Sequence, residues 1–152
     1  MKNRTFIVDA MLGGIARKLR MLGHDTTYKS DMDDDIILKT AEMEGRVLVT
    51  MDAELYNRAQ KAGIPAVRPI GQSQAEQLLH IADMVCLGEL RVDSARSRCA
   101  VCNGVLYRCD TSPDTAVLQR ACMDCSKRYW HGSHIDNLQR EIDAALLGKG
   151  DP

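Results

Sequence analysis

The sequence predicts an α/β protein in which a parallel β-sheet carries helices on its faces and is followed by a small metal-bound module and a C-terminal helix. Over residues 1–90, short apolar runs alternate with amphipathic helical patterns, the order of a parallel sheet with helical crossovers. Residues 91–152 instead contain two closely spaced cysteine pairs. A last helical pattern follows them, and its apolar face carries Leu138, Ile142 and Ala145. Residues 88–98 lose apolar periodicity, so we predict a linker there and a domain boundary near residue 90.

The first strand and helix, residues 5–22, set a pattern that three further pairs repeat. The apolar run Thr5–Val8 ends in Asp9, and apolar residues then recur at intervals of three and four, as on one helix face. Further strands are expected near 24–28, 46–50 and 64–67, and further helices near 34–44, 52–62 and 73–85. The boundary signals are Gly23, Gly45 and Gly63 at helix ends and a Ser73-to-Glu76 capping box at a helix start.

Composition and charge narrow the classes of protein. A chain of 152 residues with 27% charged and 45% hydrophobic residues is typical of a small globular protein. Its net charge of −1 excludes a polycationic nucleic-acid coat, and its 4% aromatic content argues against an extended base-stacking platform. No apolar run is long enough to span a membrane, and Asp9 interrupts the segment behind the basic N-terminus. We therefore expect a cytoplasmic protein.

Acidic residues follow the ends of two strands and precede one helix. Asp9 ends the first strand, Asp52 follows the strand at 46–50, and Asp33–Asp35 stand directly before a helical pattern. Ligands gather beyond the carboxyl ends of parallel strands, so we expect Asp9, Asp52 and one of Asp33–Asp35 on one rim. Carboxylates crowded there would repel one another unless they held a cation, and Mg²⁺ or Mn²⁺ prefers such oxygen ligands. For Asp34 or Asp52 taken alone, a purely structural role at a helix N-terminus is the favoured interpretation, and the three acids together shift the balance to a site.

The cysteine pattern is the most specific signal in the chain. Two C-x-x-C pairs, separated by residues 103–121, are formed by Cys99, Cys102, Cys122 and Cys125. Four thiolates complete the tetrahedral shell of zinc and leave no open position, so the predicted zinc is structural. Asn103 and Gly104 give the first turn a residue free to take positive φ. Six cysteines in a reducing compartment indicate metal ligands more than disulfides.

Other residues near the cysteine pairs carry weaker signals. Cys86 and Cys109 lie outside the four-cysteine pattern and are expected to be buried apolar side chains. We expect Ser133 to cap the last helix and Trp130 to pack the cysteine module against the first domain. An alternative is that Trp130 or His134 contacts nucleic acid.

Several separate motifs together resemble one family. They are the strand ending in Asp9, Leu12 to Arg20, Gly23-His24-Asp25, the helix at Asp34, Leu48-Val49-Thr50-x-Asp52, C-x-x-C-N-G from Cys99, and the run from Tyr129 to His134. Over roughly residues 5–138 the chain resembles the Mut-seven C-terminal (Mut7-C) ribonuclease domain family, PIN-like nucleases with an appended zinc ribbon. One position departs from that family, because this chain has Met51 where such domains usually carry arginine.

The resemblance implies a PIN-like fold and a metal-dependent ribonuclease that hydrolyses RNA phosphodiester bonds. The implied catalytic carboxylates, with Mg²⁺ or Mn²⁺, are Asp9, Asp34 and Asp52, and Asp35 is the second choice for the helix position. Arg17 and Arg20, on the helix after Asp9, are candidates to bind substrate phosphates, because guanidinium groups match phosphate oxygens. Basic residues that could extend this track are Arg91, Arg96, Arg98, Arg120, Lys127 and Arg128. RNA is the expected partner, with tRNA, rRNA and mRNA all open.

A second class of function is also open: a catalytically weak or inactive module that binds RNA or the ribosome and contains a structural zinc ribbon. Two other classes fit less well. A phosphoacceptor receiver domain needs a pair of acids after its first strand, where this chain has Ala10 and Met11. A dinucleotide-binding domain needs a glycine-rich turn there, and Gly13 with Gly14 alone do not supply it.

Overall fold

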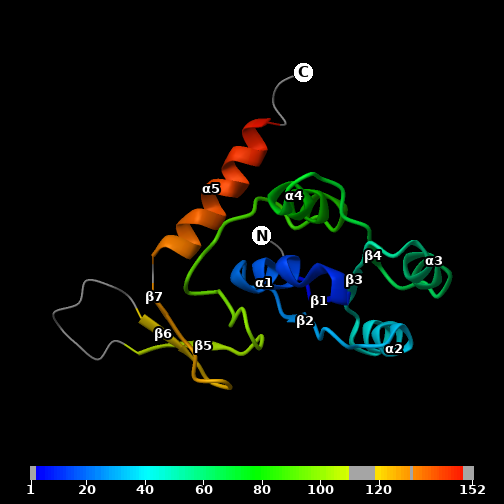
Figure 1. The fold of residues 1–152 in the computed structure, drawn as a ribbon, viewed down its shortest axis with the longest axis horizontal. Coiled ribbons are helices and arrows are strands. Elements are labelled where there is room, and N and C mark those ends of the chain that lie inside the picture. Colours follow the sequence, from blue (N-terminus) through cyan, green and yellow to red (C-terminus); the bar gives the residue numbers. More distant parts are fainter. Residues whose placement is uncertain (1–2, 110–118, 131, 149–152) are drawn as a thin grey trace.

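A parallel four-stranded sheet forms the centre of the N-terminal part of the chain, the predicted first domain (Figure 1). The computed structural model describes residues 3–109, 119–130 and 132–148. The strands are β1 (Phe6–Val8), β2 (Thr26–Thr27), β3 (Val47–Val49) and β4 (Ala66–Val67), in the order β2-β1-β3-β4. Val49 lies beside Val8 on one side and Val67 on the other, and all pairs are parallel, so these strands end at one edge of the sheet. The predicted α/β class with a parallel sheet is confirmed.

Helices cover both faces of this sheet. In chain order they are the 3-10 turn η1 (Ala10–Leu12), α1 (Gly13–Met21), α2 (Asp34–Glu44), α3 (Ala53–Lys61), α4 (Gln74–Met84) and α5 (Ser133–Gly148). Successive strand residues point to opposite faces. Phe6 and Val8 join an apolar core with α1, α4 and α5, whereas Ile7 and Leu48 join a second core with α2 and α3. Figure 1 shows the strands between these two groups of helices.

Local sequence sets the ends of the helices as predicted. Gly45 adopts φ 64 and ends α2, a left-handed conformation that costs glycine little. At the start of α4, the Ser73 hydroxyl accepts a hydrogen bond from the backbone N–H of Glu76 at 3.1 Å. The Glu76 carboxylate in turn accepts from the backbone N–H of Ser73, which completes the capping box.

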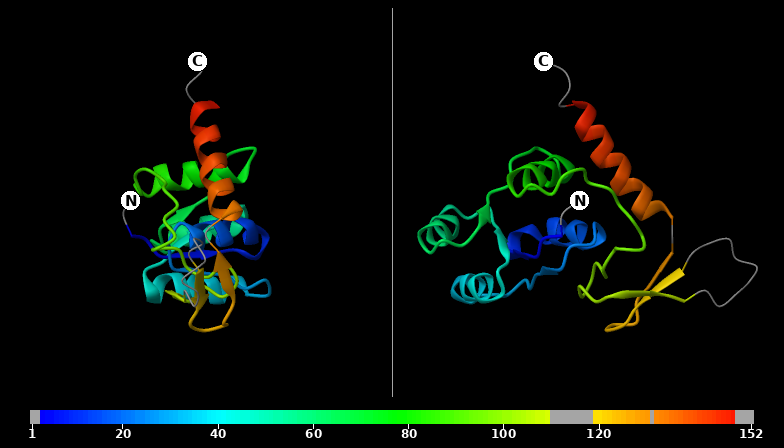
Figure 2. Two further views of the ribbon diagram at one scale, coloured as in Figure 1. Left: turned by 90° about the vertical axis from the view of Figure 1, so that its left-hand side faces the viewer. Right: turned by 180° about the vertical axis from the view of Figure 1, so that it is seen from behind.

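The C-terminal part forms an antiparallel ribbon followed by a long helix (Figure 2). The ribbon strands are β5 (Leu106–Arg108), β6 (Gln119–Cys122) and β7 (Arg128–Trp130), in the order β5-β6-β7. The apolar face predicted for α5 is confirmed, because Leu138 and Ile142 are buried in the core that also contains α1 and α4. The last helix therefore packs on the first domain, and the boundary near residue 90 stays a prediction.

Residues 88–98 are more firmly attached than the expected linker. Leu90 is buried, the Ser97 hydroxyl donates to the carbonyl of Met21 at 2.6 Å, and the Arg98 N–H donates to the carbonyl of Arg20 at 2.8 Å. The segment consequently follows the surface of α1 and leads the chain to the first cysteine pair. Within the described ranges, none of the helices has the length and apolar character that crossing a bilayer requires.

Two predictions about side-chain burial were wrong in whole or in part, and a third concerns a side chain outside the described residues. Trp130 does not pack the ribbon against the first domain, since 57% of its surface is exposed. Cys86 is exposed at the end of α4 rather than buried, and Cys109 is half-buried. The prediction that Ser133 caps α5 concerns a side chain outside the described residues. The predictions rested on the size and polarity of each side chain. Whether a side chain is buried also depends on which distant segments pack over it.

Candidate active site and cysteine centre

Asp9 lies at the carboxyl end of β1 and is fixed by two hydrogen bonds. Its Oδ1 accepts from the N–H of Ala10 at 2.6 Å and so caps η1, and its Oδ2 accepts from the Thr50 hydroxyl at 2.9 Å. Only 8% of the residue is exposed. The Thr50 hydroxyl also accepts from the backbone N–H of Asp52 at 3.0 Å, so the ends of β1 and β3 are joined through one side chain.

Asp52 and Asp34 complete the acidic rim from two helix starts. Asp52 is the N-cap of α3, where its Oδ1 accepts from the N–H of Leu55 at 3.0 Å. Asp34 lies in the first turn of α2. Loss of some surrounding water and then the negative charges of Asp9 and Asp52 raise the pKa of Asp34, although the charge of Arg58 opposes them. The three carboxylates therefore share one electrostatic environment at the carboxyl edge of the sheet.

Asp33 and Asp35, on either side of Asp34, have different surroundings. Asp35 forms an ion pair with Arg58 of α3, and 85% of the Asp35 side chain is exposed. Asp33 is the N-cap of α2, but its side chain makes no capping hydrogen bond. The charge of Asp34 interacts with those of Asp9 and Asp52.

The carboxylates of the acidic rim do not form a compact ligand set. Among the described residues, only cysteines form a group of three or more potential ligands whose atoms all lie within 4.8 Å of one another. Opposite ligands of an octahedral Mg²⁺ are about 4.2 Å apart, so one ion cannot contact all three carboxylates as they stand. Magnesium usually keeps several bound waters, and the oxygen-only donor set suits a hydrated ion. By donor chemistry alone, the rim thus suits a divalent cation that keeps some of its bound waters.

The two arginines predicted to bind phosphate have different surroundings. Arg17 is exposed on α1. Arg20 is only 4% exposed, and its guanidinium donates to the carbonyl oxygens of Thr26 and Ala100 at 2.9 and 3.0 Å. Because the turn around Ala100 packs over Arg20, this guanidinium is occupied within the protein, although it was a candidate to bind phosphate. Arg20 holds the cysteine turn against the first domain.

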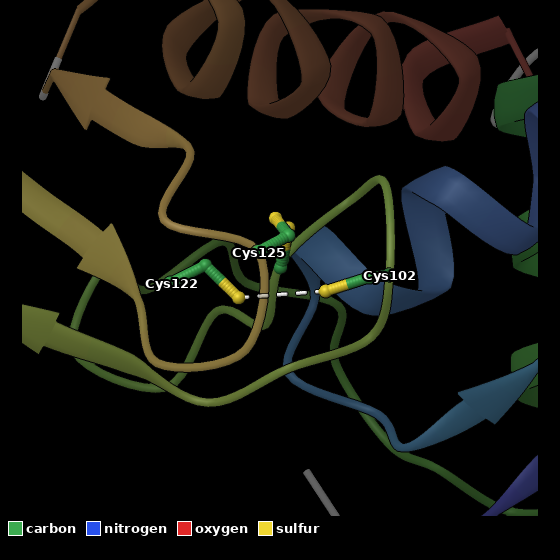
Figure 3. Close-up of side chains that lie close together, drawn as sticks. Cys102, Cys122 and Cys125 are labelled. Atoms are coloured by element: carbon green, nitrogen blue, oxygen red, sulfur yellow. Dashed lines mark hydrogen bonds between the residues drawn. The ribbon is translucent and has the colours of Figure 1, made fainter.

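The four predicted zinc ligands meet in one place. The sulfur atoms of Cys99, Cys102, Cys122 and Cys125 all lie within 4.8 Å of one another. The Cys102 and Cys122 sulfurs, joined by the dashed line in Figure 3, are 3.4 Å apart, and those of Cys99 and Cys125 are 3.6 Å apart. Tetrahedral zinc with bonds of 2.3 Å needs sulfur separations of about 3.8 Å. The cluster could therefore bind zinc with only small adjustments.

Both cysteine turns have the same backbone form. Asn103 and Ser126 take positive φ values of 70 and 63, and each N–H donates to the carbonyl of the cysteine four positions earlier. Asn103 thus adopts the positive φ expected somewhere in the Asn103-Gly104 pair. Gly104 matters for space, because a Cβ at Gly104 would lie 2.5 Å from the sulfur of Cys122. The residues of the two turns therefore leave room for the four sulfur atoms to lie together.

Hydrogen bonds make the thiols unequal in acidity. Burial raises the pKa of Cys99, but the Tyr129 hydroxyl, 3.0 Å from its sulfur, and backbone N–H groups outweigh burial and lower that pKa to about 6. Burial and neighbouring thiols raise the pKa of Cys102 to about 12. Of these two thiols, Cys99 is therefore the one that forms a thiolate at the lower pH. The role of Tyr129 was not predicted, although a tyrosine close after the second pair was a visible signal.

Asn103 also connects the cysteine turn to the sheet. Its Oδ1 accepts from the backbone N–H of Thr26 at 2.9 Å, and its Nδ2 donates to Asp25 at 2.7 Å. Asp25 in turn forms an ion pair with Arg46 at 2.9 Å. The edge strand β2 is thereby closed by a side chain from the cysteine module. Sequence reasoning missed this contact because 77 positions separate Asn103 from Thr26.

Comparison with known proteins agrees with this arrangement. The sequence model named "Mut7-C RNAse domain" matches residues 4–142. The chain belongs to the Mut7-C RNAse domain family. The predicted resemblance is confirmed, and the family name indicates a nuclease-type function.

One curated relative and the solved structures complete the comparison. This Mut7-C domain is 30% identical over 123 residues to a cysteine–tRNA ligase of Proteus mirabilis. The match covers 77% of this chain but 25% of the ligase, so the Mut7-C domain spans about a quarter of that relative's length. No solved structure matches the chain.

The Mut7-C domain carries one further cation at the acidic edge. Met51, between Thr50 and Asp52, is 39% exposed. Its carbonyl oxygen lies 3.5 Å from a guanidinium nitrogen of Arg68, which directly follows β4. Arg68 was not singled out from the sequence, although a basic residue directly after a short strand was the signal available. It brings positive charge to the edge where Asp52 lies.

Proposed function

We propose that this Mut7-C domain is a metal-dependent ribonuclease that hydrolyses RNA phosphodiester bonds at the acidic rim. The observation that chiefly supports the proposal is that Asp9 and Asp52 end neighbouring parallel strands, with Asp34 interacting electrostatically with both. Mg²⁺ or Mn²⁺, when bound there, would supply an activated water and neutralise charge on the attacked phosphate.

The residues of the rim have distinct parts in this proposal. Thr50 and Ala10 hold the Asp9 carboxylate in one orientation, so its ligand geometry is set before substrate arrives. Three carboxylates carry a charge of −3, so one divalent cation leaves −1, whereas two leave +1 and attract phosphate. We therefore propose two cations in the substrate complex. Arg68, at the same edge, would contact a phosphate oxygen.

We propose a structural role for the zinc site. Four cysteine ligands leave no coordination position for water or substrate. A bound zinc would fix the two turns that dock on α1 and β2 through Arg20 and Asn103. Metal binding would then contribute to the folding of the ribbon, which has few buried apolar residues of its own.

We propose RNA as the substrate and tRNA as the first RNA to test. The relative from Proteus mirabilis is named for action on tRNA, and this chain matches part of it. We also propose that the protein works in the reducing cytoplasm, where cysteine thiols stay available for metal.

A second function, RNA binding without catalysis, is supported by one specific observation. Asp9 and Asp52 both serve as caps of helical turns, and the three carboxylates are too far apart to contact one ion directly. Caps of this kind have a purely structural value of about 1 kcal/mol each. The two functions differ in whether RNA is cut.

The deciding experiment compares cleavage by zinc-loaded wild type, Asp9→Asn and the control Asp83→Asn, which alters an exposed acid on α4. Labelled tRNA and an unstructured RNA are incubated with Mn²⁺, with Mg²⁺ or with neither. Cleavage that needs the added cation and is lost in Asp9→Asn but kept in Asp83→Asn is expected. Chelation is avoided because it would also remove zinc. Equal cleavage by Asp9→Asn would overturn the metal site, and binding without cleavage would favour the second function.

A further inference from the structure

A cleft separates α1 from the ribbon and has a volume of about 710 Å³, within the range of about 300–1,000 Å³ found for ligand sites. One stripe of α1 forms a wall, because Gly14, Arg17, Lys18 and Met21 fall on one helix face from its first turn to its last. Gln74, at the start of α4, lines the end of the cleft near Gly14. Residues of β6 and β7 line the opposite wall.

The cleft is basic, although the chain as a whole carries a net charge of −1. Its basic lining residues are Arg17, Lys18, Arg98, Arg120, Lys127 and Arg128, and no acidic residue lines it among those the structure describes. Lys18 is partly offset by Glu141, 3.3 Å away. The Nε of Arg120 is buried without a hydrogen-bond partner in the described part of the chain. An unpaired buried donor beside a concentration of positive charge favours an anionic ligand.

The cleft also contains an exposed indole. Trp130 is the single tryptophan of the chain, lies on β7 and is 57% exposed. The neighbouring Tyr129 already has partners of its own, because its hydroxyl contacts Cys99 and Lys127 lies over its ring at 5.5 Å. An exposed aromatic ring among cations provides a stacking face for a nucleic-acid base.

We propose that this cleft binds a single-stranded segment of RNA and delivers it to the acidic rim. This proposal rests on the proposed function, in which RNA is the substrate, and it adds the path that the RNA strand takes across the protein. A base stacked on Trp130 requires an unpaired strand, whereas a duplex presents a broad minor groove to flatter surfaces. The α1 wall begins in the helix turn that directly follows η1, which Asp9 caps. Phosphates along Arg128, Arg17 and Gly14 would thus lead toward that carboxylate.

The test measures binding and cleavage separately. A labelled oligouridylate of about 12 nucleotides, its duplex with oligoadenylate, AMP, inorganic phosphate and polyglutamate are titrated onto zinc-loaded protein without added Mg²⁺ or Mn²⁺. Anisotropy reports binding by wild type, Arg17→Glu with Arg128→Glu, Trp130→Ala, and the control Lys39→Glu. Trp130 fluorescence reports it in the proteins that keep this single tryptophan. Lys39 is exposed on α2, on the other side of the sheet, and Lys39→Glu makes a charge change of the same kind. Asp9→Asn serves as the uncut reference.

We expect tight binding of the single strand with quenching of Trp130, and at least tenfold weaker binding of the duplex and of polyglutamate. Arg17→Glu with Arg128→Glu should weaken binding by about tenfold or more and reduce the slope of log K against log salt by about 1.4. Trp130→Ala should weaken it by roughly 5- to 150-fold, and Lys39→Glu by less than twofold. Equal binding of wild type and the double variant, or tighter binding of duplex or polyglutamate, would overturn the cleft proposal. Tight binding by Asp9→Asn together with absent cleavage in wild type would overturn the ribonuclease proposal alone.

Discussion

The hydroxyl of Thr50 donates a hydrogen bond of 2.9 Å to Oδ2 of Asp9 and accepts one of 3.0 Å from the backbone N–H of Asp52. Thr50 is fully buried at the end of β3. One hydroxyl therefore couples the carboxylate that ends β1 to the start of the helix that carries the second carboxylate. This coupling fixes two of the three proposed metal ligands relative to each other before any ion binds.

Replacement of Thr50 by valine should slow cleavage while leaving the protein folded. The change keeps the shape but removes both hydrogen bonds, so we expect a stability loss of about 1–3 kcal/mol and roughly tenfold slower cleavage. Rates with saturating Mn²⁺ and urea unfolding measure the two effects. Thr27→Val, a similar change on the edge strand β2, is the control. A Thr50→Val enzyme as fast as wild type would contradict the positioning role.

Replacement of Asp34 by asparagine should stabilise the protein slightly when no Mn²⁺ is present. It should also reduce the stabilisation that added Mn²⁺ provides. The pKa of Asp34 is raised, so its ionised form is disfavoured in the folded state and stability falls as pH rises through that pKa. Because Asp34 is exposed, screening limits the gain at pH 7 to about 0.5 kcal/mol, or ~1–2 °C in Tm.

Thermal unfolding at pH 4 and pH 7, with and without Mn²⁺, checks the Asp34 prediction. The gain from Asp34→Asn should be larger at pH 7 than at pH 4, and Mn²⁺ should raise its Tm less than that of wild type. Asp35→Asn is the matched control and should show neither effect, because Asp35 pairs with Arg58 instead. An unchanged response to Mn²⁺ in Asp34→Asn would remove Asp34 from the proposed site.

The cysteine centre should bind one zinc ion per chain, and its loss should destabilise the ribbon. Cys102→Ala is expected to abolish zinc binding and to lower Tm by about 10 °C or more, because zinc binding contributes folding energy. Elemental analysis and thermal unfolding provide the measurements. Cys86→Ala and Cys109→Ala should keep the zinc content of wild type, since neither belongs to the four-cysteine group. Full zinc content in Cys102→Ala would contradict the proposed ligand set.

The contact between Asn103 and Thr26 should contribute to stability independently of zinc. Asn103→Gly keeps the positive φ of 70 but leaves the N–H of Thr26 without its partner, so we expect a loss of about 1–3 kcal/mol with unchanged zinc content. Asn103→Ala should lose about 1 kcal/mol more, because alanine resists this backbone conformation. Urea unfolding of both variants separates the two causes, and equal stability of Asn103→Gly and wild type would rule out the docking role.

Several features of the fold and of the site follow from short stretches of sequence. The strand that ends in Asp9, the limits of α2 at Asp34 and Gly45, and the capping box at Ser73 all rest on local backbone chemistry. The spacing of the cysteines likewise limits how two turns can face one ion. These features could be predicted because residues within about five positions of one another determine them.

Sequence by itself thus determined the α/β class, the family and the cluster of four cysteines. Only the tertiary structure decided that Arg20 is buried, that Trp130 is exposed, and that Asp35 forms an ion pair with Arg58. The contact of Arg20 with Ala100 spans 80 positions, and the bond from Thr50 to Asp9 spans 41. Periodicity and spacing describe how one segment folds. The partner that each side chain meets depends on how distant segments pack together, and no local pattern records that.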